Sequence, residues 1–355
     1  MPILNQNAVP ETITKLIEQG DFLSLSRTQP ELFSSPFQFL LEQDTKVSVI
    51  AEGIIIFEPT SESNLDIVLS CGVHGNETAP IEICDNLVKQ LLKGEIKAKQ
   101  RVLFLFGNLP AMDIAKRFVQ ENMNRLFSGA HSELSTGQQM NAERMRAKQL
   151  EQAIKGFYLA VKSPAGRSRY HYDLHTAIRA SKNDKFAVYP FQNGKAWDTY
   201  QLQILLACGV NTILLSGSPT TTFSYYSVNE FSAQAFTVEL GKVQAFGQND
   251  MQNFEGVIST LTNLITGKDL SLKAYDQSDF LIYKVNQVIN KQHSEFKLNF
   301  VEDTPNFTDF SKGHILASEP GREYLAQVDG EAIVFPNADV EIGQRALLTV
   351  IPTTI

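Results

Sequence analysis

Between residues 46 and 268, short apolar segments alternate with segments of helical periodicity, and this alternation limits the possible folds most strongly. "VSVIAEGIIIFEP", "LDIVLSCGV" and "QRVLFLFG" have the length and β-branched composition of buried strands, whereas residues 81–92 place apolar side chains at helical spacing. Strands that alternate with helices build an α/β layer architecture. In open sheets of this class, ligands bind just beyond the carboxyl ends of the strands, so the polar residues that follow each strand are the first site candidates.

The pattern changes after about residue 268. "DFLIYKVNQVI", "EAIVFP" and "RALLTVIP" are short strand candidates separated by glycine, proline, asparagine and aspartate, which predicts a small β-rich domain. Residues 1–45 are polar and mixed, with only short helical patterns. We therefore expect an N-terminal extension that packs on the core (1–45), a main α/β domain (46–268) and a β-rich C-terminal domain (269–355).

Charge and composition restrict the possible partners. The net charge is −8 and there is no long run of lysine or arginine, which argues against nucleic acid and acidic membrane surfaces as partners. No apolar stretch approaches the roughly 20 residues that span a bilayer, and the N-terminus lacks a basic segment followed by an apolar core. Cys71, Cys84 and Cys208 lie far apart in apolar surroundings, as is typical of core residues in a reducing compartment. We expect a cytoplasmic protein, and its oligomeric state stays open.

The segment "SCGVHGNETAP" (70–80) places His74 and Glu77 three residues apart, directly after an apolar strand. A histidine nitrogen and a carboxylate oxygen in one turn can bind the same Zn²⁺ ion. The alternative is a polar turn in which Gly72 and Gly75 allow a tight backbone and the histidine binds nothing. The sequence contains neither His-Glu-x-x-His nor Cys-x-x-Cys, so a zinc site needs a third ligand from a distant part of the chain.

A third ligand is available in "YHYDLHTAIR" (170–179). Side chains alternate along a strand, so His171, Asp173 and His175 share one face if this segment is a strand. His175 lies at the carboxyl end, where ligands bind in such sheets, and Asp173 is placed to orient its imidazole. The alternative is that both histidines are ordinary half-buried strand residues.

Two further constellations would complete a catalytic site. Glu239 ends the apolar strand "FTVEL", where partial loss of solvent raises the pKa of a carboxyl towards that of a useful base. Arg117, Asn124 and Arg125 lie in a polar region between a strand and a long helix. Arginine binds carboxylates through two parallel hydrogen bonds, so this region suits an anionic substrate. Each of these residues is, taken alone, also compatible with an ordinary solvated surface position.

The motifs "GVHGNE", "NMNRLF", "DLHTAIR" and "VELG", in this order over about 170 residues, resemble the zinc carboxypeptidase-like superfamily. More specifically, they resemble its succinylglutamate desuccinylase and aspartoacylase branch. The resemblance implies that the main domain is a zinc-hydrolase domain with a central mixed sheet flanked by helices. It also implies that His74, Glu77 and His175 hold one Zn²⁺ per subunit.

The same resemblance assigns roles to the remaining motif residues. It implies that Glu239 is the general base, that Arg117 polarises the scissile carbonyl, and that Asn124 and Arg125 bind the substrate. The family's usual Asn-Pro is replaced here by Asn-Leu-Pro at residues 108–110, although the spacing to the arginines is kept.

The continuation of the second motif, "TAIR" (176–179), is more similar to succinylglutamate desuccinylases than to aspartoacylases. The implied reaction is the hydrolysis of N-succinyl-L-glutamate to succinate and L-glutamate, the final step of the arginine succinyltransferase route of arginine catabolism. This small anionic substrate has three carboxylates, which calls for one more cation, and Arg179 is the candidate.

Two other classes of function stay open at this point. One is an aspartoacylase-like deacylase of another N-acyl amino acid, or a carboxypeptidase. The other is a zinc-dependent binding or structural protein whose site does not turn over. Glu239 and Arg117 argue against the second class, because a structural zinc needs neither a base nor a carbonyl-polarising cation.

Overall fold

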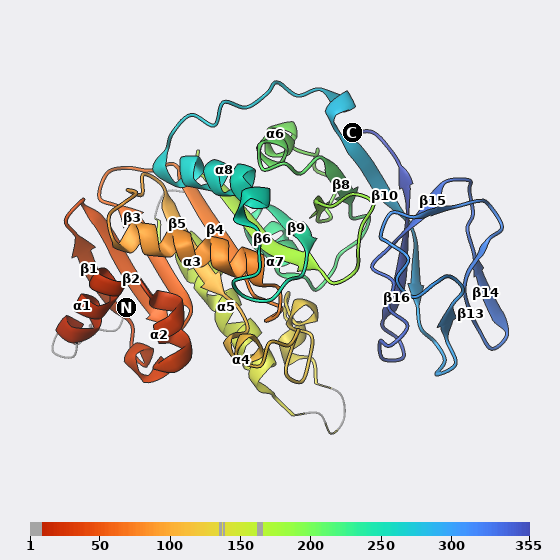
Figure 1. The fold of residues 1–355 in the computed structure, drawn as a ribbon, viewed down its shortest axis with the longest axis horizontal. Helices are drawn as coiled ribbons and strands as arrows, with labels where there is room; N and C mark the ends of the chain where they lie inside the picture. Colours follow the sequence, from red (N-terminus) through yellow and green to blue (C-terminus); the bar gives the residue numbers. More distant parts are fainter. Residues whose placement is uncertain (1–8, 135–136, 138, 162–165) are drawn as a thin grey trace.

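The structure is a computed structural model that describes residues 9–134, 137, 139–161 and 166–355. Within this part of the chain, 13 strands form one long sheet in the order β1-β2-β3-β5-β4-β6-β9-β7-β8-β10-β16-β15-β12. A second, three-stranded sheet has the order β11-β13-β14. Figure 1 shows helices around the first half of the long sheet and a strand-rich region, coloured blue, at the other end.

The strands of the long sheet, in chain order, are β1 (Phe37–Leu41), β2 (Thr45–Ala51), β3 (Ile54–Pro59), β4 (Leu65–Cys71), β5 (Arg101–Phe106), β6 (Ser168–Ala177), β7 (Phe186–Tyr189), β8 (Thr212–Leu215), β9 (Gln234–Lys242), β10 (Leu281–Asn290), β12 (Asp309–Phe310), β15 (Glu331–Val334) and β16 (Arg345–Pro352). Those of the small sheet are β11 (Lys297–Leu298), β13 (Ile315–Glu319) and β14 (Arg322–Leu325). The α-helices are α1 (Val9–Gln19), α2 (Phe22–Thr28), α3 (Thr78–Leu92), α4 (Leu109–Asp113), α5 (Ala142–Leu159), α6 (Thr199–Ala207), α7 (Phe223–Phe231) and α8 (Glu255–Thr266). Among the described helices, none is both long and apolar enough to cross a bilayer.

The centre of the long sheet is parallel, whereas its flanks are mixed. Strands β5, β4, β6 and β9 run parallel to one another, β3 pairs antiparallel with β5, and β7 pairs antiparallel with β9. All six residues of β5 are buried, as expected for a parallel strand that helices cover on both faces. The predicted mixed sheet flanked by helices is confirmed.

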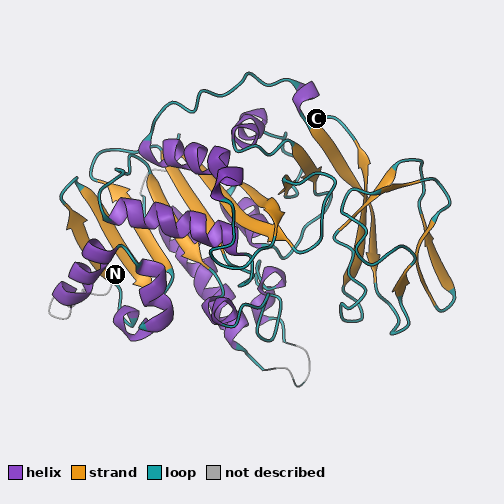
Figure 2. Ribbon diagram, viewed as in Figure 1, coloured by secondary structure: helices purple, strands orange, loops and turns teal. Residues whose placement is uncertain are grey.

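Helices cover both faces of the parallel centre, and the alternation of side chains along β4 assigns each residue to one face. Ile67 and Leu69 belong to the apolar cluster that includes Leu87 of α3. Val68, which points the other way, belongs to the cluster that includes Leu150 of α5. Figure 2 shows α3 and α8 in front of the sheet and α5 behind it. Two layers of helices therefore fix the edge at which the parallel strands end.

The ends of the chain extend this core. Leu16 of α1 and Phe22 of α2 are fully buried in the same apolar cluster as α3, and β1 pairs with β2 at the sheet edge. At the other end, β10 pairs parallel with β8 and antiparallel with β16. The β-rich C-terminal region is thus joined to the main domain through one continuous sheet. The boundaries at 45/46 and 268/269 stay predictions.

Candidate metal centre and active site

Three predicted ligands meet just beyond the carboxyl ends of two neighbouring parallel strands. His74 and Glu77 lie in the turn between β4 and α3, and His175 lies near the end of β6, which pairs with β4. One potential ligand atom from each of the three residues lies within 4.8 Å of the other two, and all three side chains are buried. The strand-end position that the sequence predicted for a site therefore brings together residues that are about 100 positions apart.

Tight backbone packing holds the first turn in place. Gly75 lies so close to α4 that an added Cβ atom would be 2.2 Å from the carbonyl carbon of Ala111, which is shorter than any real contact. The Gly75 amide donates a hydrogen bond of 3.1 Å to the carbonyl oxygen of Arg117. Glycine at position 75 therefore allows the turn that carries His74 and Glu77 (the ligand turn) to touch the segment that carries Arg117 and Arg125 (the arginine loop).

His74 and His175 both direct Nδ1 towards the candidate metal position beside Glu77. Glu77 lies between them, with Oε1 2.8 Å from Nδ1 of His74 and Oε2 2.7 Å from Nδ1 of His175. Their other nitrogens are held from behind, His74 Nε2 by Asn122 Oδ1 and His175 Nε2 by Asp173 Oδ2, each at 2.9 Å. Hydrogen bonds of this kind fix the tautomer and the ring orientation of metal-binding histidines.

The electrostatics of this cluster suit a cation. Burial, followed by the nearby charge of Arg117, lowers the pKa of His74 to about 4, so its imidazole is neutral at physiological pH and its ring can act as a ligand. Although burial opposes it, the carboxylates of Asp173 and Glu77 raise the pKa of His175 well above its ordinary value. Nδ1 of His74 is buried and, although it lies 2.8 Å from Glu77 Oε1, it forms no hydrogen bond within the described residues. Two imidazole nitrogens and a carboxylate form a donor set that fits a catalytic Zn²⁺ ion with an open position.

A buried polar chain supports His175 from the sheet side. Ser70 donates to Asp173 Oδ1 at 2.5 Å and lies 2.8 Å from Nε2 of His171, whose Nδ1 lies 2.8 Å from the Ser227 hydroxyl. His171 and Asp173 share the face of β6 with His175, as their spacing predicted. Asp173 contacts the ligand histidine directly, whereas His171 is one step further away and belongs to the supporting chain.

Glu239 lies beside the centre, near the end of β9. Its Cα is paired with that of His175 across the β6–β9 ladder. The carboxyl is buried, and its Oε2 has no hydrogen-bond partner within the described residues. Burial, followed by the negative charge of Glu77, raises the pKa of Glu239 to about 7. A carboxyl with this pKa is well suited to exchange protons near neutral pH.

The arginine loop reaches the centre through Arg117. Its Nη1 donates to Glu77 Oε1 at 2.6 Å, and its side chain is half-buried. Asn124 and Arg125 lie in the short 3₁₀ turn Met123–Arg125. The Asn124 amide oxygen accepts from the backbone N–H of Phe223 at 3.1 Å, which fixes the loop against α7. Arg125 Nη1 donates to the Asn124 carbonyl at 2.9 Å.

Arg179 is placed differently. Its Nη1 donates to the carbonyl oxygens of Glu302 and Thr304, and its Nη2 donates to that of Pro336 at 3.4 Å. The guanidinium thus joins the end of β6 to the C-terminal region, and no described contact links it to the other site residues. Its role in substrate binding stays a prediction without a supporting contact.

Sequence reasoning did not select two supporting residues of the site. Asn122 is the first asparagine of the motif "NMNRLF", and its place in a motif that already supplied Asn124 and Arg125 was the available signal. Ser70 is a lone hydroxyl in the apolar strand β4, one residue before the ligand turn begins. Both contact their partners only because separate segments meet at the sheet edge, which single-segment patterns do not encode.

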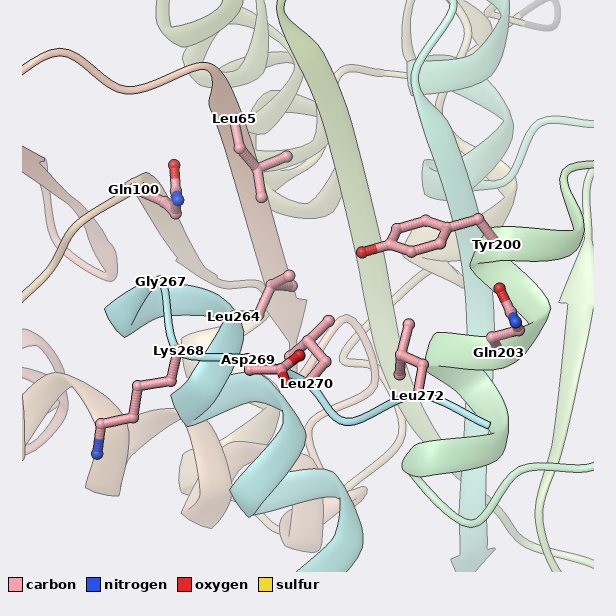
Figure 3. Close-up of a pocket in the computed structure, with 10 residues that line it drawn as sticks. All are labelled: Leu65, Gln100, Tyr200, Gln203, Leu264, Gly267, Lys268, Asp269, Leu270 and Leu272. Carbon is pink, nitrogen blue, oxygen red and sulfur yellow. The ribbon is translucent and has the colours of Figure 1, made fainter. Parts of the chain in front are cut away.

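A separate cavity of about 540 Å³ lies at the opposite end of the strands. Leu65 begins β4, Gln100 directly precedes β5, and both line this cavity together with Tyr200 of α6. Figure 3 shows these side chains around the segment that follows α8. The cavity therefore lies at the amino ends of the parallel strands, away from His74 and His175.

The geometry of the site and the fold agree with comparisons to known proteins. Residues 63–265 match the family described as the succinylglutamate desuccinylase/aspartoacylase catalytic domain, and residues 278–353 match the AstE/AspA barrel-sandwich hybrid domain. The chain belongs to the succinylglutamate desuccinylase/aspartoacylase family, and the resemblance found in its motifs is confirmed.

Proteins named succinylglutamate desuccinylase match this chain over almost its whole length. The succinylglutamate desuccinylase of Pseudoalteromonas atlantica is 59% identical over 343 residues, which is 97% of each chain. The crystal structure of succinylglutamate desuccinylase from Vibrio parahaemolyticus is similar with a TM-score of 0.83 and 32% identity, and covers 93% of this chain and 94% of that one. That from Chromobacterium violaceum gives a TM-score of 0.82 and 33% identity over 94% and 98% of the two chains.

Proposed function

We propose that this protein is a zinc-dependent amide hydrolase that cleaves N-succinyl-L-glutamate to succinate and L-glutamate, as the final step of the arginine succinyltransferase route. The observation that carries the proposal is the cluster of His74, Glu77 and His175 ligand atoms within 4.8 Å of one another, with the buried Glu239 alongside. The names of full-length relatives, which include a protein 59% identical to this chain, support the choice of substrate.

Two Nδ1 nitrogens and the Glu77 carboxylate would hold one Zn²⁺ per subunit. When bound, Zn²⁺ supplies Lewis acidity that polarises a carbonyl and makes water a stronger acid. Glu239 accepts a proton from the water whose oxygen attacks the succinyl carbonyl carbon. The C–N bond then breaks, and Glu239 returns that proton to the leaving amine of glutamate. A pKa of about 7 suits both transfers.

The arginine loop would supply orientation and charge stabilisation. A guanidinium has five N–H donors, and Arg117 uses one of them on Glu77, so others are available for the carbonyl oxygen as it becomes negative. Asn124 and Arg125 would orient a substrate carboxylate, since Arg125 is half-buried and pairs with no described carboxylate. We place the reaction in the cytoplasm on the basis of the cysteine pattern.

A substrate panel tests the proposal. Zinc-loaded protein is incubated with N-succinyl-L-glutamate, N-acetyl-L-aspartate and a short peptide, and the release of free amine is measured. The expected result is a kcat/KM for succinylglutamate at least 100-fold above the others, with activity lost on chelation. Preference for acetylaspartate or the peptide would point instead to an aspartoacylase-like deacylase or a carboxypeptidase, and zinc binding without any turnover would point to a non-catalytic site.

The variant Glu239→Gln tests the role of the base separately. Glutamine keeps the size of the side chain but cannot accept the proton, so we expect full zinc content and a fall in kcat of at least 100-fold. Zinc content is measured by metal analysis, and kcat by amine release at substrate saturation. A variant that retains near wild-type kcat would show that another group is the base.

A further inference from the structure

The proposed substrate needs more cationic partners than the sequence motifs provide, and the inference that follows rests on that proposed function. N-succinyl-L-glutamate has three carboxylates, and a buried carboxylate without a partner is costly. Arg117 already donates to Glu77, and Arg179 donates to carbonyl oxygens of the C-terminal region. Among the predicted binding residues, only Arg125 has a guanidinium without a described carboxylate or distant carbonyl partner.

A second such guanidinium comes from the C-terminal region. Arg345 is the first residue of β16, and its guanidinium carbon lies 5.7 Å from the centre of the Phe335 ring. The Phe335 ring packs against that of Phe186 at 5.6 Å. Phe186 in turn begins β7, where its Cα is paired with that of Glu239. Two aromatic rings therefore connect Arg345 to β7, the strand that pairs with the one that carries the candidate base.

Arg345 is half-buried, and its guanidinium lacks the partners that the buried arginines Arg101 and Arg144 have. Arg101 pairs with two carboxylates, and Arg144 donates to both oxygens of one carboxylate as well as to backbone carbonyls. Arg345, in contrast, forms no hydrogen bond or ion pair through its guanidinium within the described residues, and its Nε is buried without a partner. Buried donors are almost always hydrogen-bonded, so this group is suited to bind something that is not part of the chain.

The positive charge of Arg345 acts on the guanidinium of Arg125. Burial, followed by the positive charge of Arg345 and then that of Arg117, lowers the pKa of Arg125 to about 9. Burial lowers the pKa of Arg345 to about 10. Both groups are still protonated at neutral pH, so the site holds neighbouring like charges that an anion would stabilise. The two oxygens of a carboxylate can accept hydrogen bonds from two guanidiniums at once.

We propose that Arg345 is a substrate-binding residue, and that it and Arg125 bind one carboxylate of the substrate between them. The C-terminal region then contributes a side chain to the site, because Arg345 lies on β16 and β16 is part of the long sheet. Arg179 contributes indirectly in this arrangement, because its hydrogen bonds hold the C-terminal region against the end of β6.

The variant Arg345→Met tests this inference, and Arg322→Met is its matched control. Arg322 also lies over an aromatic ring, 4.5 Å from that of Tyr324, but it is exposed on β14 of the small sheet. For Arg345→Met we expect a rise of at least tenfold in the KM for succinylglutamate and a change in kcat of less than threefold. Arg345→Lys keeps the charge and is expected to recover part of the loss. Zinc content and the urea unfolding midpoint report whether each variant is folded.

Direct binding of succinate and of L-glutamate, measured by calorimetry, separates this inference from the proposed reaction. Wild type and Arg322→Met are expected to bind at least one of the two with equal affinity, and Arg345→Met at least tenfold more weakly. Equal affinities for wild type and Arg345→Met, or no binding by wild type, would overturn the role of Arg345. Absence of wild-type turnover together with the expected binding pattern would refute the proposed reaction alone.

Discussion

Replacing Asp173 by asparagine removes one negative charge behind the candidate metal centre and leaves the shape of the side chain almost unchanged. Asp173 is fully buried and accepts from His175 at 2.9 Å and from Ser70 at 2.5 Å. A hydrogen bond to a charged group contributes about 1.5–3 kcal/mol. Asparagine keeps an acceptor oxygen but loses the charge, so we expect about 1.4–2.7 kcal/mol of metal-binding free energy to be lost. This corresponds to a zinc affinity that is roughly 10- to 100-fold weaker.

The assay is a competition for zinc between the protein and a chromogenic chelator, with wild type and variant at equal concentration. Asp85→Asn provides a matched control, because it makes the same chemical change on α3 and Asp85 has no described contact with the three ligands. Far-UV circular dichroism verifies that both variants fold. A zinc affinity of Asp173→Asn within twofold of wild type, in a folded protein, would refute the claim that Asp173 supports His175 as a ligand.

The remaining predictions concern stability. Gly75→Ala forces a Cβ to 2.2 Å from backbone of α4, so we expect a loss of at least about 2 kcal/mol in urea unfolding and weaker zinc binding. Gly156→Ala on α5, where no atom lies within 4 Å, should instead gain up to about 1 kcal/mol, and equal effects of the two changes would contradict the packing argument. Burial, followed by the charge of Asp21, raises the pKa of Asp85 from 3.8 to about 6, so this carboxyl destabilises the fold increasingly as pH rises from 4 to above 6. Asp85→Asn should therefore gain up to about 3 kcal/mol at pH 8 and about half of that at pH 5. The same gain at both pH values would refute the assignment to this carboxyl and its charged neighbours, which are Asp21, Arg27, Glu82 and Lys89.

Local patterns were sufficient for much of the main domain. Apolar spacing predicted the helix that the structure describes as α3, and Gly94, with a φ of +70°, follows its end as predicted. The segments "LDIVLSC" and "RVLFLF" form β4 and β5. These predictions succeed because burial on one face or on both faces of an element leaves a direct record in the order of residues along the chain.

The C-terminal region was predicted less completely. Its short strands were expected, but their order in space was not, and β10 and β16 continue the main sheet beyond β8. Strand pairing joins segments that are distant in sequence, and the pattern within one strand does not specify which edge it will join. The region also contains two strands of only two residues each, β11 and β12.

For the site, the sequence by itself determined which chemistry is available at each strand end: His74 and Glu77 in one turn, His175 on one face of its strand, and a carboxyl at position 239. The spacing of residues within one turn or strand determines which side chains share a face, because the backbone repeats regularly along that element. Only the tertiary structure decided which side chains hydrogen-bond to the ligands from behind, and that Arg345 has an unpaired guanidinium whereas Arg179 does not. Those relations depend on distances between segments that packing alone brings together.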